Sequence, residues 1–138
     1  MVCVAPPVTF KPVEFDRRAT GDLWEIDGMT GERIAYYRKE IAAGNFVVLG
    51  LSVRGQRRAT LIYSVQSEPM GARCLVVHEM GGASMADVSL ASAAETACEH
   101  IASQVGANKL RIWTKRKGLL RVLRDGFELT YVAERKIG

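Results

Sequence analysis

Hydrophobic and polar residues recur with two different periods along the chain, and the change of period separates expected helices from expected strands. Apolar residues three and four positions apart predict a helix over residues 30–44. Thr30 can cap the start of this helix, and Gly44 suits the position just past its end. The same spacing, interrupted by a glycine, predicts a shorter helix within residues 16–27.

The central part of the chain changes to short runs rich in β-branched residues. Runs at 45–53 and 57–65 predict two strands, and the three residues between them predict a hairpin loop. Residues 72–79 predict the next strand, which completes a three-stranded antiparallel meander. The weaker alternation of residues 8–13, with a proline near the end, is typical of an edge strand.

The clearest helical pattern covers residues 84–105, and its alanine-rich face allows close packing on a sheet. Residues 109–114 predict a strand, 117–126 a short helix and 127–137 a last strand. The expected order is therefore β, α, α, β, β, β, α, β, α, β. We predict one α/β domain over residues 1–138, with a mixed six-stranded sheet and helices on both faces.

Composition places the chain among ordinary globular domains. It has 138 residues, of which 48% are hydrophobic and 25% are charged. No apolar run approaches the roughly 20 residues that span a bilayer, and the first residues lack the pattern of a secretory signal. We therefore expect a non-secreted protein of cytoplasmic type, without a membrane span.

The cysteines and histidines do not have the spacing of a metal site. Three cysteines are scattered along the chain, no two of them form a CxxC pair, and only two histidines accompany them. We expect buried reduced thiols and no metal. The residues concerned are Cys3, Cys74, Cys98, His78 and His100.

Positive charge is concentrated at the C-terminal end. The whole chain carries a net charge of +4, and residues 109–138 hold nine basic residues against three acidic ones. Such a segment suggests an anionic partner, which includes a nucleotide phosphate, nucleic acid or an acidic protein face. A solvated basic surface is the other interpretation. The candidate anion-binding residues are Lys115, Arg116, Lys117, Arg121 and Arg124.

Two stretches, in this order of elements, resemble the GNAT-type N-acetyltransferase superfamily. One is "CLVVHEMGG" (74–82), followed by "SLASAAETACEHIASQVGANKLRIWTK" (89–115), which resembles the strand, helix and strand around the family's cofactor loop. The other is "GLLRVLRDGFELTYV" (118–132), which is similar to the family's last helix and strand. The resemblance implies a GNAT-like fold over nearly the whole chain.

The resemblance also implies where acetyl-CoA would bind. The family holds the pyrophosphate on backbone amides of an Arg/Gln-x-x-Gly-x-Gly/Ala loop at a helix start. The matching stretch here is "MGGASMAD" (80–87), which lacks the basic residue at the required spacing and carries Asp87 in the first helical turn. A phosphate cradle and a plain turn with a helix cap are both open interpretations. The candidate residues are Gly81, Gly82, Ala83 and Ser84.

The catalytic groups implied by the resemblance are also altered. Many members place a tyrosine acid four residues before a Gly-Phe pair, and Val122 stands there in this chain. The candidate base is Glu79, which is alternatively only a strand-end carboxylate. Alternation along a strand predicts that His78 and Glu79 point to opposite faces. Tyr63 and Tyr131 are expected to be packed strand residues.

These departures lead us to expect a GNAT-like protein with a degenerate acetyl-CoA site. It would be a non-catalytic structural or assembly protein whose partners are other protein subunits, and it would need no cofactor. The segment "TKRKGLLRVLRDGFE" (114–128) is similar to small GNAT-like proteins encoded among tailed-phage structural genes, which implies a virion component.

Two alternatives belong to other functional classes. The first is an active N-acetyltransferase that binds acetyl-CoA through an atypical pyrophosphate loop. The second is a nucleic-acid-binding module that uses the basic C-terminal third, where Trp113 is the one aromatic residue that could stack on a base.

Overall fold

The computed structural model describes residues 8–26, 28–82 and 88–112. Within these ranges the chain forms three α-helices, five strands and one short 3₁₀ turn. The elements are β1 (Val8–Pro12), α1 (Arg17–Trp24), α2 (Gly31–Ala42), β2 (Val47–Val53), β3 (Gln56–Ser67), the 3₁₀ turn (Pro69–Gly71), β4 (Arg73–Gly81), α3 (Val88–Val105) and β5 (Lys109–Ile112).

The five strands form one mixed sheet in the order β1-β2-β3-β4-β5. The first four are antiparallel to their neighbours, and β5 pairs with β4 in parallel after the crossover through α3. This arrangement confirms the predicted meander, the edge position of the first strand and the mixed sheet. The helix expected at 117–126 and the sixth strand expected at 127–137 lie outside the described residues.

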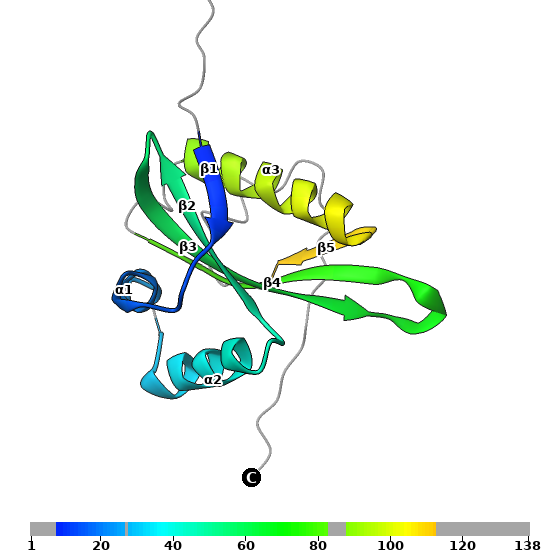
Figure 1. Cartoon of the computed structure of the whole chain (residues 1–138), viewed down its shortest axis with the longest axis horizontal. Coiled ribbons are helices and arrows are strands. Elements are labelled where there is room, and N and C mark those ends of the chain that lie inside the picture. The colour runs from blue at the N-terminus through cyan, green and yellow to red at the C-terminus, as the bar shows by residue number, and fades with distance from the viewer. Residues whose placement is uncertain (1–7, 27, 83–87, 113–138) are drawn as a thin grey trace, which may run out of the picture.

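Helices cover both faces of the sheet, as predicted (Figure 1). One face, called here the α3 face, buries a cluster of apolar side chains against α3. The opposite face, called the α1–α2 face, buries a second cluster beneath α1 and α2. The α3 face includes Leu49, Leu61, Leu75, Val77, Ala94, Cys98 and Ile101. The α1–α2 face includes Leu23, Ile34, Tyr37, Val48 and Ile62.

Local sequence explains where the first two helices begin and end. The carboxylate of Asp16 accepts a hydrogen bond from the Ala19 amide at the start of α1, and the Thr30 hydroxyl accepts one from the Arg33 amide at the start of α2. After α2 the backbone turns into the left-handed region at Gly44, with a φ of 79°. Both boundaries of α2 were predicted from these residues.

Two features of the sheet were not predicted. The β2–β3 connection is a two-residue turn in which Arg54 and Gly55 both have positive φ, at 52° and 79°. This geometry is that of a type I′ turn, where asparagine, aspartate or glycine usually occupies the first position. In addition, β3 and β4 each contain a bulge, whose extra residue is Arg58 in β3 and His78 in β4.

Candidate functional site at the end of β4

The bulge in β4 brings His78 and Glu79 to the same side of the sheet. Ile62 pairs with Glu79 and Tyr63 pairs with Val77, so His78 is left without a partner in the register. His78 stacks on Phe46, and Glu79 contacts α2, which places both side chains on the α1–α2 face. The prediction that they point to opposite faces is wrong, because the extra residue interrupts the alternation of the strand.

Glu79 is buried and already has two partners from α2. The Tyr37 hydroxyl donates a hydrogen bond of 2.8 Å to Oε1 of Glu79, and the Arg33 guanidinium forms an ion pair with the same carboxylate. Burial raises the pKa of Tyr37, although the nearby Arg33 acts in the opposite direction. Glu79 thus pairs with the charge of Arg33 and accepts the hydrogen bond of the buried Tyr37 hydroxyl. These contacts hold α2 against β4.

His78 occupies a half-buried position beside this contact. Its Nε2 lies 2.7 Å from the hydroxyl oxygen of Ser64, and its ring stacks on Phe46 with centroids 4.2 Å apart. Burial lowers the pKa of His78 below the usual 6.5, so the neutral ring predominates at neutral pH. The His78 ring is thus a stacked, hydrogen-bonded part of the α1–α2 face. In the sequence, only its position beside Glu79 in "LVVHE" pointed to His78.

Gly81 and Gly82 are held against the chain's own backbone. A Cβ at Gly81 would overlap the carbonyl oxygen of Asp22 in α1, and a Cβ at Gly82 would overlap that of Arg58 in β3. The room that a side chain would need is therefore filled by two carbonyl groups. A packing requirement thus explains both glycines, and their role in holding a pyrophosphate stays a prediction.

Several candidate residues lie outside the described residues, so they remain sequence-based predictions. They are Ala83, Ser84 and Asp87 of the expected cofactor loop, Val122 at the acid position, Tyr131 and the basic residues Lys115, Arg116, Lys117, Arg121 and Arg124. Tyr63 is described, and it packs against the cluster on the α3 face as expected.

The thiols of the described residues are packing groups, and Cys3 lies outside the described residues. Cys74 and Cys98 are buried and free, and burial raises the pKa of Cys98 to about 12.

Across residues 8–26, 28–82 and 88–112, no cluster of His, Cys, Asp or Glu has the composition of a metal site. No helix in this part of the chain is long and apolar enough to cross a membrane.

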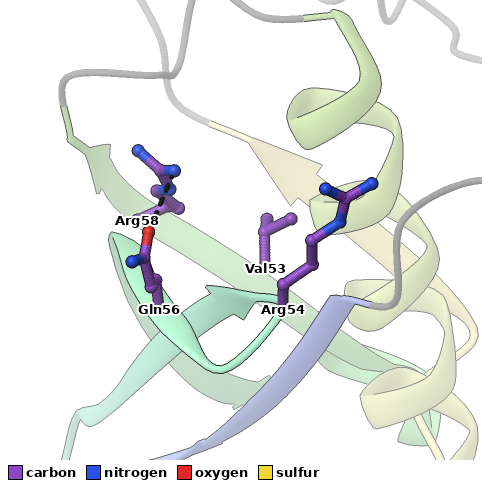
Figure 2. A pocket seen from close by; sticks show the side chains of 4 residues that line it. All are labelled: Val53, Arg54, Gln56 and Arg58. Atoms are coloured by element: carbon purple, nitrogen blue, oxygen red, sulfur yellow. Dashed lines mark hydrogen bonds between the residues drawn. The ribbon is translucent and has the colours of Figure 1, made fainter.

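Open hollows occur on the described surface at the β2–β3 hairpin, away from Glu79. One of about 350 Å³ is lined by Arg18, Gln56, Arg57 and Arg58. Another of about 440 Å³ is lined by Val53, Arg54, Gln56 and Arg58 (Figure 2). The sequence pattern predicted only a loop here, although "VRGQRR" holds three arginines and no acidic residue, which is a signal for a cationic surface.

Solved structures share this fold at low sequence identity. A transcriptional regulator from Bacillus halodurans C-125 superposes with a TM-score of 0.71 at 13% identity, over 96% of this chain and 100% of that one. A ribosomal-protein-alanine N-acetyltransferase from Brucella melitensis biovar Abortus 2308 gives 0.68 at 16% identity, over 95% and 99%. A predicted acetyltransferase with acetyl-CoA from Clostridium acetobutylicum gives 0.66 at 11% identity, over 94% and 96%.

No protein-family model and no curated protein sequence matches the chain. The structural likeness, together with the strand order and the helices on both faces, shows that the chain has the fold of the GNAT-type N-acetyltransferases. The resemblance found in the sequence is confirmed at the level of the fold.

Proposed function

We propose that this GNAT-fold protein has a degenerate acetyl-CoA site and acts by binding other proteins rather than by acetyl transfer. The observation that carries the proposal is the state of Glu79, the candidate base. It is 7% exposed and engaged by both Arg33 and Tyr37, so it is not available to take a proton from an amine.

The glycine pair supports the same proposal. Gly81 and Gly82 face the carbonyl groups of α1 and β3 rather than an open space, so their presence does not require a bound phosphate. Acetyl-CoA would have to be held by other residues. A place among the proteins of a virion assembly, which the likeness of residues 114–128 implies, is part of this proposal.

A binding experiment with acetyl-CoA tests the proposal directly. The purified chain is titrated with acetyl-CoA up to millimolar concentration, and unfolding is followed by thermal shift. A ligand present at 100 times its Kd would stabilise the folded state by about 2.7 kcal/mol. We expect no shift of the unfolding temperature. A shift that saturates with acetyl-CoA concentration would contradict the proposal that the site is degenerate.

Acetyl transfer is the second candidate, because a structure with acetyl-CoA from Clostridium acetobutylicum superposes on 94% of this chain. Release of the CoA thiol is measured with a panel of primary amines, including peptide N-termini and amino sugars. If thiol release occurs and is lost in Glu79→Gln while the fold is retained, Glu79 is the base and the second candidate replaces the first. Size-exclusion chromatography with the proteins of the native assembly then tests the binding role.

A further inference from the structure

Arginines gather at the end of the sheet where β2 turns into β3. Arg54, Arg57 and Arg58 come from the hairpin itself, and Arg18 comes from the neighbouring helix α1. They line two open hollows, which share Gln56 and Arg58. The hairpin segment "VRGQRR" contributes three positive charges and no negative one.

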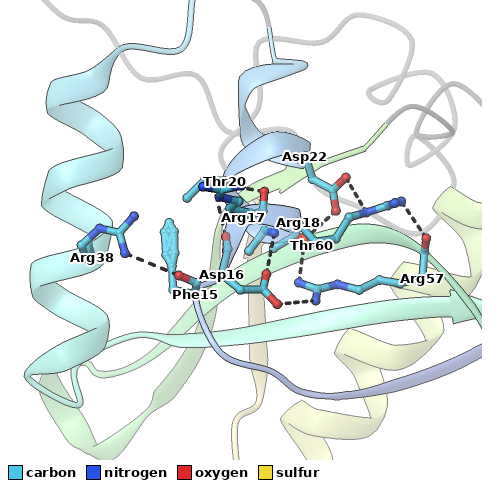
Figure 3. A network of polar contacts seen from close by, with 10 residues as sticks. Phe15, Asp16, Arg17, Arg18, Thr20, Asp22, Arg38, Arg57 and Thr60 are labelled. Atoms are coloured by element: carbon cyan, nitrogen blue, oxygen red, sulfur yellow. Dashed lines mark hydrogen bonds and ion pairs between the residues drawn. The ribbon is translucent and has the colours of Figure 1, made fainter.

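Two of these arginines are already neutralised inside the fold (Figure 3). Arg18 forms an ion pair with Asp22 at 3.3 Å and donates a hydrogen bond to the Arg57 carbonyl. Arg57 forms an ion pair with Asp16, also at 3.3 Å, and its side chain lies over Gly50. These contacts fix α1 to the hairpin, and they leave neither arginine as a free cation.

The other two arginines have no acidic partner among the described residues. The Arg58 guanidinium donates a hydrogen bond of 3.2 Å to the side-chain amide oxygen of Gln56. Arg54 lies at the tip of the turn, and Figure 2 shows its side chain leaving the turn on the side where α3 is drawn. Both side chains are exposed. Within the described ranges, the end of the hairpin therefore presents two cations without an acidic partner, on a base that Asp16 and Asp22 hold in place.

The backbone at both positions departs from regular strand geometry. Arg54 has a φ of 52°, in the left-handed region where an arginine is unusual, and Arg58 is the extra residue of the β3 bulge. A bulge re-aims the side chain of its extra residue, and a type I′ turn projects its first residue from the tip. Both irregularities thus serve to present an arginine.

We propose that the β2–β3 hairpin binds the phosphodiester backbone of nucleic acid without reading its sequence. Arginine forks match the geometry of phosphate oxygens and can bind them in pairs. Two hollows that share Arg58 allow contact with more than one phosphate along a strand. This site is independent of the proposed state of the acetyl-CoA site.

The side chains around the hollows favour nucleic acid over a protein partner. Among the described residues that line the hollows, Val53 is the one apolar side chain and none is aromatic. Protein interfaces depend on buried aromatic and apolar anchors, which this surface lacks. The lack of aromatic residues also excludes base stacking at the hairpin, so affinity must come from phosphate contacts.

The test measures binding of a labelled 20-base-pair duplex by fluorescence anisotropy between 50 and 200 mM salt. Full-length wild type is compared with the double variant Arg54→Asn/Arg58→Gln, because asparagine suits the first position of a type I′ turn and preserves the hairpin. We expect the variant to bind about tenfold or more weakly at the lowest salt concentration. The slope of log K against log salt should become shallower by about 2, since each lost phosphate contact removes about 0.9.

A matched control variant, Lys39→Gln/Arg73→Gln, removes the same charge from α2 and from the opposite end of β4. It should bind like wild type, and circular dichroism checks that both double variants are folded. Equal weakening in the two variants would overturn the hairpin site and assign binding to overall charge or to the basic C-terminal third. If poly-glutamate binds as tightly as DNA and its binding also depends on the hairpin, the proposed partner is wrong, and the hairpin binds an acidic protein face instead of nucleic acid.

Discussion

His78 and Glu79 show how a single extra residue changes what a strand presents to its neighbours. Without the bulge, the two side chains would lie on opposite faces and one of them would meet α3. With it, both meet the α1–α2 face, where Glu79 pairs with Arg33 and His78 packs on Phe46. The chemistry at the end of β4 is thus set by strand register as much as by residue type.

The buried carboxylate leads to a prediction about stability. Glu79→Gln keeps an acceptor for the Tyr37 hydroxyl but cannot pair with Arg33, so unfolding free energy should fall by about 1 kcal/mol, as Arg33 is partly exposed to solvent. Urea denaturation measures the change. Glu99→Gln, an exposed position on α3, is the control and should change stability by less than about 0.5 kcal/mol. An unchanged stability for Glu79→Gln would contradict the packing role.

The burial of His78 leads to a prediction about how stability depends on pH. Burial lowers the pKa of His78 in the folded chain. As the pH falls through about 6.5, His78 is therefore protonated in the unfolded chain while it is still neutral in the folded chain. Stability should therefore fall as the pH drops from 7.5 through 6.5 towards the lowered value. His78→Gln should flatten this slope, whereas His100→Gln, at an exposed position, should retain it. Equal slopes in the two variants, measured by urea denaturation, would refute the assignment.

At the scale of the elements, the ends of α1 and β4 approach each other so closely that only glycine fits. A methyl group at Gly81 would meet the Asp22 carbonyl, which belongs to a helix and cannot move freely. Local pattern predicted α1, the strand and the glycines, but not this contact. It joins residues 59 positions apart, as the numbers 22 and 81 show, and nothing in either segment alone specifies it.

A pair of glycine substitutions tests the contact. Gly81→Ala should lower the free energy of unfolding by about 1–3 kcal/mol, the usual cost of forcing atoms into a packed space. Gly21→Ala is the matched control, because nothing lies within 4 Å of a Cβ there and the residue sits inside α1. The control should gain about 0.5–1 kcal/mol from helix propensity. Thermal and urea unfolding measure both, and a neutral Gly81→Ala would show that α1 can withdraw from β4.

At the scale of the whole molecule, one sheet carries two separate hydrophobic clusters. Leu61 and Ile62 are consecutive in β3, and each is almost fully buried on a different face. The sheet therefore couples the packing of α3 to that of α1 and α2. Loss of either cluster leaves an apolar face of the same strands exposed, so the two faces should unfold together.

Truncation on either face tests this coupling. Leu61→Ala and Ile62→Ala should each lower stability by about 2–5 kcal/mol, because each removes buried methyl groups and leaves a cavity. Far-ultraviolet circular dichroism and intrinsic tryptophan fluorescence should report one coincident transition in both variants. Separate transitions in either variant would contradict the view of a single cooperative unit.

The sequence by itself determined the kinds and order of the elements within the described part of the chain. Period, caps and turn residues act over a few positions, so α2 (Gly31–Ala42), with Thr30 before it and Gly44 after it, and the meander of β2, β3 and β4 followed from local chemistry. The sheet with helices on both faces followed from that order, because each apolar face needs a cover.

Only the tertiary structure decided what the chemical groups do. The bulges at Arg58 and His78 arise from the pairing of strands, and the partners of Glu79 and Gly81 come from distant helices. Arg54 and Arg58 differ from Arg57 and Arg18 only in three dimensions, because Asp16 pairs with Arg57 and Asp22 pairs with Arg18. Charge compensation and close backbone approach depend on distances in space, and those distances are fixed by packing between segments that are remote in the sequence.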